Sequence, residues 1–462
     1  FSTGDIVLST DGTTTFTTGT GGGDITIGAK IDGTAGEAEA LAITSGTGNI
    51  AIQGAIGGAQ KFSTIAINST AGSGTIEVAN IGAGAVGASS TVAIGNTDTT
   101  TLTLDGTVYK STSGQTYTAA TGGGNIDITG IATFTTTNTA VAFNTSGVDL
   151  AQNVAITTGT GGAGDVTFQG AVEAANAGTQ TLTIDSGTGD VTFSKKIGET
   201  NALGGLNVNA TDGDGDGDIT FTEDIGDSSA GVKGVTAVGN SSTNQIIFSE
   251  DTYTFDTGAT TFTTADGDKI VLGKGADTTF TTVGTDISFA GGHIKLNDDS
   301  DLIVNTGTGN GDITIAEIAG TTQETVSLNA GTGTTSVGAI GSGTEIGVLS
   351  IGSSANGGIT LNGAIVTDGA VTIDGPVTLA TAAVSVTTAD DNISFDHSID
   401  GSQTLTLRSG TGAIAIQGAI GADHTKILTG LSINATDGDT GTIEITDIGD
   451  ADAEGVNTGS IS

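Results

Sequence analysis

Short bursts of alternating apolar and polar residues recur along the whole chain. Residues 25–27 (Ile-Thr-Ile) and 41–43 (Leu-Ala-Ile) are typical, and each is followed by a stretch rich in Gly, Ser and Thr. Alternation with a period of two places both apolar side chains on one face of an extended segment. The bursts are too short for helices, and no apolar stripe at helical spacing persists. The pattern predicts an all-β protein of many short strands separated by Gly-rich turns.

The bursts belong to internal repeats. Residues 45–57 (SGTGNIAIQGAIG) and 409–421 (SGTGAIAIQGAIG) differ at one position, and related copies begin at Ser186 and Ala330. A second motif, TGTG followed by GDITI or GDVTF, precedes three of these copies and begins at Thr18, Thr158 and Thr306. A third motif follows and begins at Ile65, Leu206 and Leu431. The first two copies of each motif lie 141 residues apart, which indicates a long repeating unit.

These repeats favour one continuous β-solenoid over residues 1–462. We expect long units at about residues 18–157, 158–305 and 306–462, the last one irregular. Stacked coils place like on like, with Ile over Ile inside and Thr over Thr outside. With about 23 residues in a coil, the sequence predicts a parallel β-helix of about 20 short coils. Tandem immunoglobulin-like domains are the main alternative, but they usually contain core aromatics and Pro, and this chain has 4% aromatics and one Pro.

Composition narrows the setting and the partners. Acidic residues outnumber basic ones by 51 to 11, which gives a formal charge of −40. Such a chain repels nucleic acid and anionic membranes, and it needs salt or divalent cations to screen its own charge. There is no Cys for disulfides or thiol metal sites, and no apolar run long enough to insert into a membrane. There is no initiator Met or signal-peptide pattern, so we expect a portion of a longer, secreted protein.

The motifs SGTG-x-[IV]-x-[IF] and TGTGG-GD[IV]T[IF] resemble the repeat regions of giant bacterial surface proteins, which include filamentous-haemagglutinin-like adhesins and autotransporter passengers. The resemblance covers the whole chain and rests on repeat style, since no secretion motif is present. It implies export to the cell surface, a right-handed parallel β-helix, and a role in attachment, biofilm matrix or filament formation. It assigns no functional residues.

The sharpest local signal for chemistry is an acidic run at residues 212–223. It fits the calcium-loop pattern D-x-D-x-D-G-x5-E, in which several carboxylates converge on a hard cation. Its strand-like flanks argue against a helix–loop–helix hand, and a solvated acidic turn is the alternative. A bound calcium ion would be structural. The candidate ligands, including those of the equivalent turn near the end of the chain, are Asp212, Asp214, Asp216, Asp218, Glu223, Asp437 and Asp439.

Three Asn residues occupy one repeat phase, each within an Asn-x-Thr triplet: Asn68, Asn209 and Asn434. One interpretation is glycosylation of a surface protein. The alternative is an Asn at a corner of the coil, whose amide hydrogen-bonds the backbone of the turn.

We do not expect an enzyme. A polysaccharide-degrading β-helix would need a carboxylate cluster with a basic clamp, and the chain has a single Arg, Arg408. Its three His residues lie far apart in sequence: His293, His397 and His424. A dedicated ice-binding face would need Thr ranks with a strict short period, whereas the repeats here vary in length.

The sequence therefore predicts a structural or adhesive segment of a secreted cell-surface protein, the shaft of an extracellular filament, sheath or large adhesin. Its expected partners are other copies of itself or adjoining repeats in head-to-tail contact, together with cell-surface glycans. The alternative is a calcium-dependent carbohydrate-binding or ice-binding repeat protein.

Overall fold

The computed structural model forms two compact units, Phe1–Ile246 and Ile247–Ser462. It describes all residues except 2–3, 35–37, 69, 71, 84–85, 163, 212–216, 227–230, 274, 276, 298–299, 322, 342, 353–356, 382, 424, 435–437, 450–455 and 457–462. No helix occurs in the described part of the chain. The strands are parallel and stack in about 17 coils, which confirms the predicted β-solenoid with somewhat fewer and longer coils than expected.

In the first unit, each coil contributes one strand or one bridging residue to each of three parallel sheets, which we call faces A, B and C. Face A contains β1 (Ile6–Val7), β4 (Ile31–Asp32), β11 (Val108–Lys110), β14 (Thr133–Thr135), β17 (Val154–Thr157), β20 (Thr181–Asp185), β22 (Gly205–Val208) and β24 (Thr236–Val238). Face B contains β2 (Gly12–Thr17), β5 (Glu39–Thr44), β7 (Thr64–Ile67), β9 (Val92–Ile94), β12 (Gln115–Thr118), β15 (Val141–Asn144), β18 (Val166–Phe168), β21 (Val191–Phe193) and β23 (Asp218–Phe221). Face C contains β3 (Ile25–Ile27), β6 (Ile50–Ile52), β8 (Ile76–Val78), β10 (Thr101–Leu104), β13 (Asn125–Ile128), β16 (Gly147–Leu150) and β19 (Ala171–Ala174).

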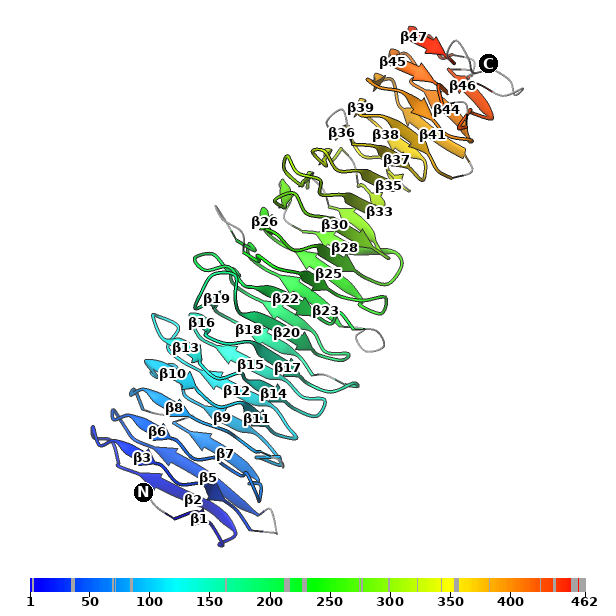
Figure 1. Ribbon diagram of the computed structural model, residues 1–462. Coiled ribbons are helices and arrows are strands. Elements are labelled where there is room, and N and C mark those ends of the chain that lie inside the picture. Colours follow the sequence, from blue (N-terminus) through cyan, green and yellow to red (C-terminus); the bar gives the residue numbers. More distant parts are fainter. Residues whose placement is uncertain are drawn as a thin grey trace. The chain divides into compact units, whose positions relative to one another are not determined.

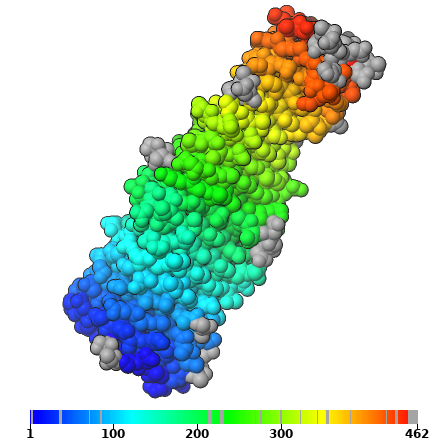
Figure 2. Space-filling view, viewed as in Figure 1, coloured from blue at the N-terminus to red at the C-terminus, as the bar shows by residue number. Residues whose placement is uncertain are grey.

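Single bridging residues continue two of these faces where no strand forms. Ile56 and Ile81 connect β4 to β11 on face A, and Ile197 and Ile225 extend face C beyond β19. Figure 1 shows the strands of face B following one another from β2 to β18. On the side shown in Figure 2, the colours of successive coils of this unit follow in order, from blue to green.

The second unit is built in the same way, with faces that we call D, E and F. β25 (Gln245–Phe248) crosses the boundary between the units. Face D contains β26 (Thr252–Thr254), β29 (Thr278–Thr281), β32 (Leu302–Asn305), β34 (Val326–Asn329), β36 (Leu349–Gly352), β39 (Val371–Asp374) and β42 (Ile393–Phe395). Face E contains β27 (Thr260–Thr263), β30 (Ile287–Ala290), β37 (Ile359–Leu361), β40 (Val377–Leu379) and β43 (Ile399–Asp400). Face F contains β28 (Asp268–Leu272), β31 (His293–Leu296), β38 (Ile365–Thr367), β41 (Ala383–Thr388), β44 (Thr404–Arg408) and β46 (Gly430–Ile433).

Four longer strands of the second unit turn a corner and belong to two faces. β33 (Ile313–Ala319) and β35 (Thr335–Ile340) run from face E to face F, because their first halves pair on E and their last residues on F. β45 (Ile414–Ile420) and β47 (Ile443–Ile448) run from face D to face E in the same manner.

Like residues stack on like between neighbouring coils, as the repeats predicted. On face C, Ile25 pairs with Ile50, Ile50 with Ile76, and Ile76 with Leu102, in steps of 25, 26 and 26 residues. The alternation sends both Ile side chains of β3 inward and the intervening Thr26 outward, where it is exposed. The coil exceeds the expected 23 residues because the Gly-rich turns are longer than the alternation alone indicates.

Equivalent copies of the long repeat nevertheless lie on different faces. In the first unit, the GDITI strand of the first copy, β3, is on face C, whereas its equivalent in the second copy, β18, is on face B. Five coil steps from β3 along face C lead to β16, and β17 and β18 then follow on faces A and B. The 141-residue unit therefore makes five and two-thirds turns, and each copy is displaced by one face.

The second unit shows the same displacement independently. Val337 belongs to the repeat copy that begins at Ala330 and pairs on face E, whereas its equivalent Ile416, in the copy that begins at Ser409, pairs on face D. The intervening 79 residues make three and two-thirds turns. The rotation of the motif by one face is thus a property of both units.

Candidate functional site

The SGTG turn is held by its Ser residue and by an Asn of the next coil. Ser186 Oγ donates a hydrogen bond to the carbonyl of Gly189 (2.7 Å), and the Ser186 amide donates to Oδ1 of Asn209 (2.8 Å). The copies around Ser45 with Asn68 and around Ser409 with Asn434 repeat both contacts. Each turn is therefore fixed locally and also tied to the following coil.

The three Asn residues of the Asn-x-Thr triplets are these corner residues. Asn68, Asn209 and Asn434 have positive φ values of 42°, 47° and 44°, a conformation that Asn tolerates better than most residues. Each Nδ2 donates to the Ser Oγ of the preceding coil, at 3.2, 2.8 and 3.0 Å. Asn68 and Asn209 are also buried. The geometry is that of the corner interpretation, and a glycan would require Nδ2 to leave this hydrogen bond; glycosylation stays a prediction.

The Asp of the GDITI motif accepts a hydrogen bond from the next coil. Asp24 Oδ1 accepts from the amide of Asn49 at 2.8 Å, and Asp165 Oδ1 accepts from the amide of Asp190 at 3.0 Å. Asp190 Oδ1 in turn accepts from the amide of Asp218 at 2.8 Å. A carboxylate is well suited here because it offers only acceptors to backbone N–H groups. Much of the acidic composition thus serves to connect coils.

Glu173 makes the most extensive of these contacts between coils. Its carboxylate accepts from three successive amides of the next coil: Glu199 at 3.0 Å, Thr200 at 3.2 Å and Asn201 at 2.7 Å. Burial raises the pKa of Glu173, the three amides oppose that rise, and the charge of Asp149 adds to it. Asp149 is the cross-strand neighbour of Glu173 on face C.

The predicted calcium ligands are only partly within the described residues, since Asp212, Asp214, Asp216 and Asp437 lie outside them. The three that are described already contact protein donors. Asp218 accepts from Nδ2 of Asn244 at 2.6 Å, Glu223 pairs with Lys195, and Asp439 pairs with Arg408 at 3.3 Å. Within the described residues, no group of three or more His, Cys, Asp or Glu side chains is placed to hold a metal ion. Calcium binding stays a prediction.

The described His residues pair with acids of a neighbouring coil. His293 Nε2 lies 3.0 Å from Glu317 Oε2, and His397 Nε2 lies 3.3 Å from Asp374 Oδ1. His424 is outside the described residues. The sequence placed His397 beside Asp396, but its ion-pair partner belongs to the preceding coil, which only the stacking could reveal.

A buried Glu or Gln six residues before each SGTG-type turn escaped the sequence analysis. The position is occupied by Glu39, Gln180, Glu324 and Gln403 in the four copies. Glu39 accepts hydrogen bonds from the amide and hydroxyl of Thr34, and Glu324 accepts from both groups of Thr321. The hydroxyl of Thr34 lowers the pKa of Glu39. Alignment of the copies around their turns would have found this position, because only Glu and Gln occur there.

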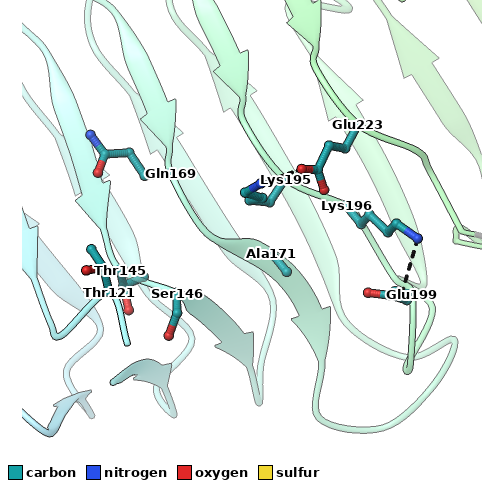
Figure 3. A pocket seen from close by; sticks show the side chains of 9 residues that line it. All are labelled: Thr121, Thr145, Ser146, Gln169, Ala171, Lys195, Lys196, Glu199 and Glu223. Carbon is teal, nitrogen blue, oxygen red and sulfur yellow. Dashed lines mark hydrogen bonds and ion pairs between the residues drawn. The ribbon is translucent and has the colours of Figure 1, made fainter. Parts of the chain in front are cut away.

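A groove in the first unit crosses the edge between faces B and C over five successive coils (Figure 3). Its volume is about 310 Å³. The lining residues are Thr121, Thr145, Ser146, Gln169, Ala171, Lys195, Lys196, Glu199 and Glu223. Thr121 and Gln169 are exposed, and Lys195 and Lys196 both lie at one end of the groove.

Both Lys residues of the groove are matched by carboxylates. Lys195 pairs with Glu223, and Lys196 lies 3.2 Å from Glu199 and 3.5 Å from Asp224. The groove therefore offers donors and acceptors side by side without an excess of positive charge. No helix that could cross a membrane is present among the described residues. No protein-family model, no curated protein and no solved structure matches this chain, so the proposals below rest on its own sequence and geometry.

Proposed function

We propose that the chain is a structural element, the shaft of an extracellular filament, sheath or large adhesin. The observation that carries this proposal is the displacement of the long repeat by one face in each copy. A repeat that moves around the axis gives no single face a regular array of its motif. Selection on such a repeat acts on how coils stack, and coil stacking is what a shaft needs.

The contacts between coils support a load-bearing role. Backbone hydrogen bonds connect each strand to its neighbours along every face, and carboxylate and corner Asn contacts add to them. Parallel ladders of this kind resist separation because many bonds must break together. Short Thr, Ser and Ala side chains on the outer positions leave the backbone ladder as the main structural component.

The same proposal names the partners. Parallel strands at the end of a solenoid have unpaired N–H and C=O groups, which pair readily with another strand. The partner is therefore an adjoining stretch of repeats or another copy of this chain, in head-to-tail contact. Divalent cations would reduce repulsion between such acidic surfaces. The setting is the cell exterior, where calcium is available.

An ice-binding role is the less favoured alternative. Ice binding needs one flat face with a strict short period, and the displaced repeat spreads its outward Thr residues over several faces instead. On face B the outward Thr167 and Thr192 are cross-strand neighbours, but the equivalent Thr26 lies on face C. Thermal hysteresis of the purified protein would favour the alternative.

Negative-stain microscopy with calcium and then with a chelator tests the proposal. Regular fibres that fray under chelator are the expected result, because cations would then screen the acidic contacts between copies. Uniform particles unaffected by chelator would favour an adhesin shaft that needs no self-association. Irregular globular particles, or a strict monomer at high concentration with calcium, would contradict head-to-tail association.

A further inference from the structure

The groove between faces B and C exists because two corners are unusually short. Two residues, Thr145 and Ser146, separate β15 from β16, and two more separate β18 from β19. In the preceding coil, the loop 119–124 separates β12 from β13 and rises beside these corners. The short corners form the floor of the groove.

Close stacking keeps this floor low. A Cβ atom on Gly170 would lie 2.5 Å from the carbonyl carbon of Ser146 and 2.6 Å from the carbonyl oxygen of Thr145. Only Gly fits at such a distance, so the backbone of one corner rests directly on the corner before it. Ser146 Oγ donates to the carbonyl of Gly124, which fixes the floor against the neighbouring loop.

The groups that point away from this floor are available to a ligand. Gln169 is exposed, and its side chain makes no hydrogen bond within the described residues. The Lys195 side chain is 54% exposed although it pairs with Glu223. An ammonium has three N–H donors, and a carboxylate has several acceptor sites, so one ion pair leaves donors and acceptors free. Donor and acceptor groups thus alternate along the groove.

We propose that this groove binds a neutral, polyhydroxylated chain, an uncharged oligosaccharide. Hydroxyl groups both donate and accept, which matches a lining that offers an amide, hydroxyls, an ammonium and carboxylates. An anionic ligand is disfavoured because both Lys charges are already matched and the chain carries a formal charge of −40. An apolar ligand would leave these polar groups unpaired. The volume of about 310 Å³ lies at the small end of the range for ligand sites.

This inference goes beyond the structural role and does not depend on it. A shaft needs no ligand in this groove, whereas the site would give one stretch of the shaft an affinity for surface glycans. Because the second-copy motif is displaced by one face, the groove has no equivalent at the same edge in the first copy. The site is accordingly expected once in this unit, not once in each repeat.

An array of neutral oligosaccharides, with uronic-acid and sialylated oligosaccharides as anionic comparison, tests the proposal on the full chain. Titration calorimetry then measures the affinity of any ligand that binds. Gln169→Ala and Lys195→Met should each weaken binding by about tenfold, the loss expected for one hydrogen bond to a ligand. Both side chains are exposed, so the variants should keep the circular-dichroism spectrum and melting temperature of the unchanged protein.

The chain contains a matched control. Gln53 begins the same Gln-Gly-Ala corner as Gln169, is also exposed, and lies at a different edge, between β6 and Ile56. Gln53→Ala should therefore leave binding unchanged. The proposal is overturned if no neutral glycan binds, if only anionic glycans bind, or if the Gln169, Lys195 and Gln53 variants bind equally well.

Discussion

The first and second copies of the long repeat use the same turns around different cores. In the first copy the strands β3, β6 and β8 lie on face C and bury aliphatic side chains. In the second copy the equivalent strands β18, β21 and β23 lie on face B, and the second inward residue of each is Phe. The motif thus fixes strand and turn, while the residues inside follow the face on which the motif lies.

The Phe residues of the second copy continue an aromatic stack that begins before it. Tyr117 and Phe143 on face B precede Phe168, Phe193 and Phe221. Successive ring centroids lie 5.4, 4.9, 5.2 and 5.4 Å apart, and the planes become nearly parallel, from 16° to 2°. The spacing follows the distance between neighbouring strands. A Phe placed on face B therefore gains an aromatic neighbour on each side.

The added volume is compensated within the strand. Ile50 and Ile52 of the first copy become Val191 and Phe193 in the second, so a smaller residue accompanies the larger one. Volume-conserving exchanges of this kind are the ones that packed cores tolerate. The comparison teaches that a coil is packed as a whole, and that its repeat motif can be transferred to any face if the total volume is kept.

The largest expected effect comes from removing a ring from the stack. Phe193→Ala should cost about 3–5 kcal/mol of local stability, because it removes a buried ring and its contacts with Phe168 and Phe221. Ile52→Ala at the equivalent position should cost about 2–5 kcal/mol and lack the stacking term. Native-state hydrogen exchange measures both, since stability in a solenoid is not a single global quantity.

Exchange should accelerate in the strands on both sides of Phe193, and Phe193→Leu should recover part of the loss. Equal losses from Phe193→Ala and Ile52→Ala would show that the stack contributes no more than apolar burial does. The difference between the two copies would then be one of composition only.

A smaller effect is expected at the corners, where the two copies should agree. Ser186→Ala and Ser45→Ala each remove a hydroxyl that donates to the Gly three residues later and receives the next coil's Asn amide. Each variant leaves the buried Asn Nδ2 without this acceptor and should cost about 1–3 kcal/mol. Hydrogen exchange of the two turns measures the loss. Thr at the same position retains the hydroxyl and serves as the control.

If Ser186→Ala and Ser45→Ala differed by much more than the spread for one hydrogen bond, the corner would depend on its face. That outcome would contradict the interpretation of the turn as a locally determined unit.

The smallest expected effect is an opposite response to pH in the two regions. Burial, together with Asp149, raises the pKa of Asp127 and Glu173, so the native state near them binds protons more readily than the unfolded chain does. Stability there should rise as the pH falls from these raised values toward the usual carboxyl pKa. Hydrogen bonds from Thr34 lower the pKa of Glu39, so its contribution is present above the usual pKa and is lost as the pH falls through the lowered one.

Protection factors of β16 and β5, corrected for intrinsic exchange rates, measure these opposite trends. Asp149→Asn should weaken the trend at β16, and Glu39→Gln should remove it at β5. The second copy already carries Gln180 at the position of Glu39, so this variant is expected to fold. Parallel trends in both strands would contradict the assigned causes.

The fold class could be predicted from the sequence because its signals are local. Alternation within residues 25–27 determines which side chains point inward, and the repeated turns determine that neighbouring coils stack alike. The corner role of Asn209 was also within reach, since Asn at one repeat phase is typical of a turn with positive φ. Each of these inferences needs only a residue and its near neighbours in sequence.

The face of each motif could not be predicted. Counting faces requires knowing that the single residue Ile56 occupies a whole face, and nothing in the stretch around it distinguishes a face from a turn. The groove was missed for the same reason, since Gln169 and Lys195 are brought to one edge only by the stacking of coils.

The sequence by itself determined the short parallel strands, the turn chemistry and the like-on-like register, because these follow from alternation and from contacts within a motif. The tertiary structure alone decided where each motif lies around the axis, which carboxylates meet the amides of the next coil, and where short corners leave a groove. These depend on the accumulated length of all preceding turns, a quantity that no single motif encodes. A change of one turn by a few residues would shift every later contact at an edge while leaving each motif intact.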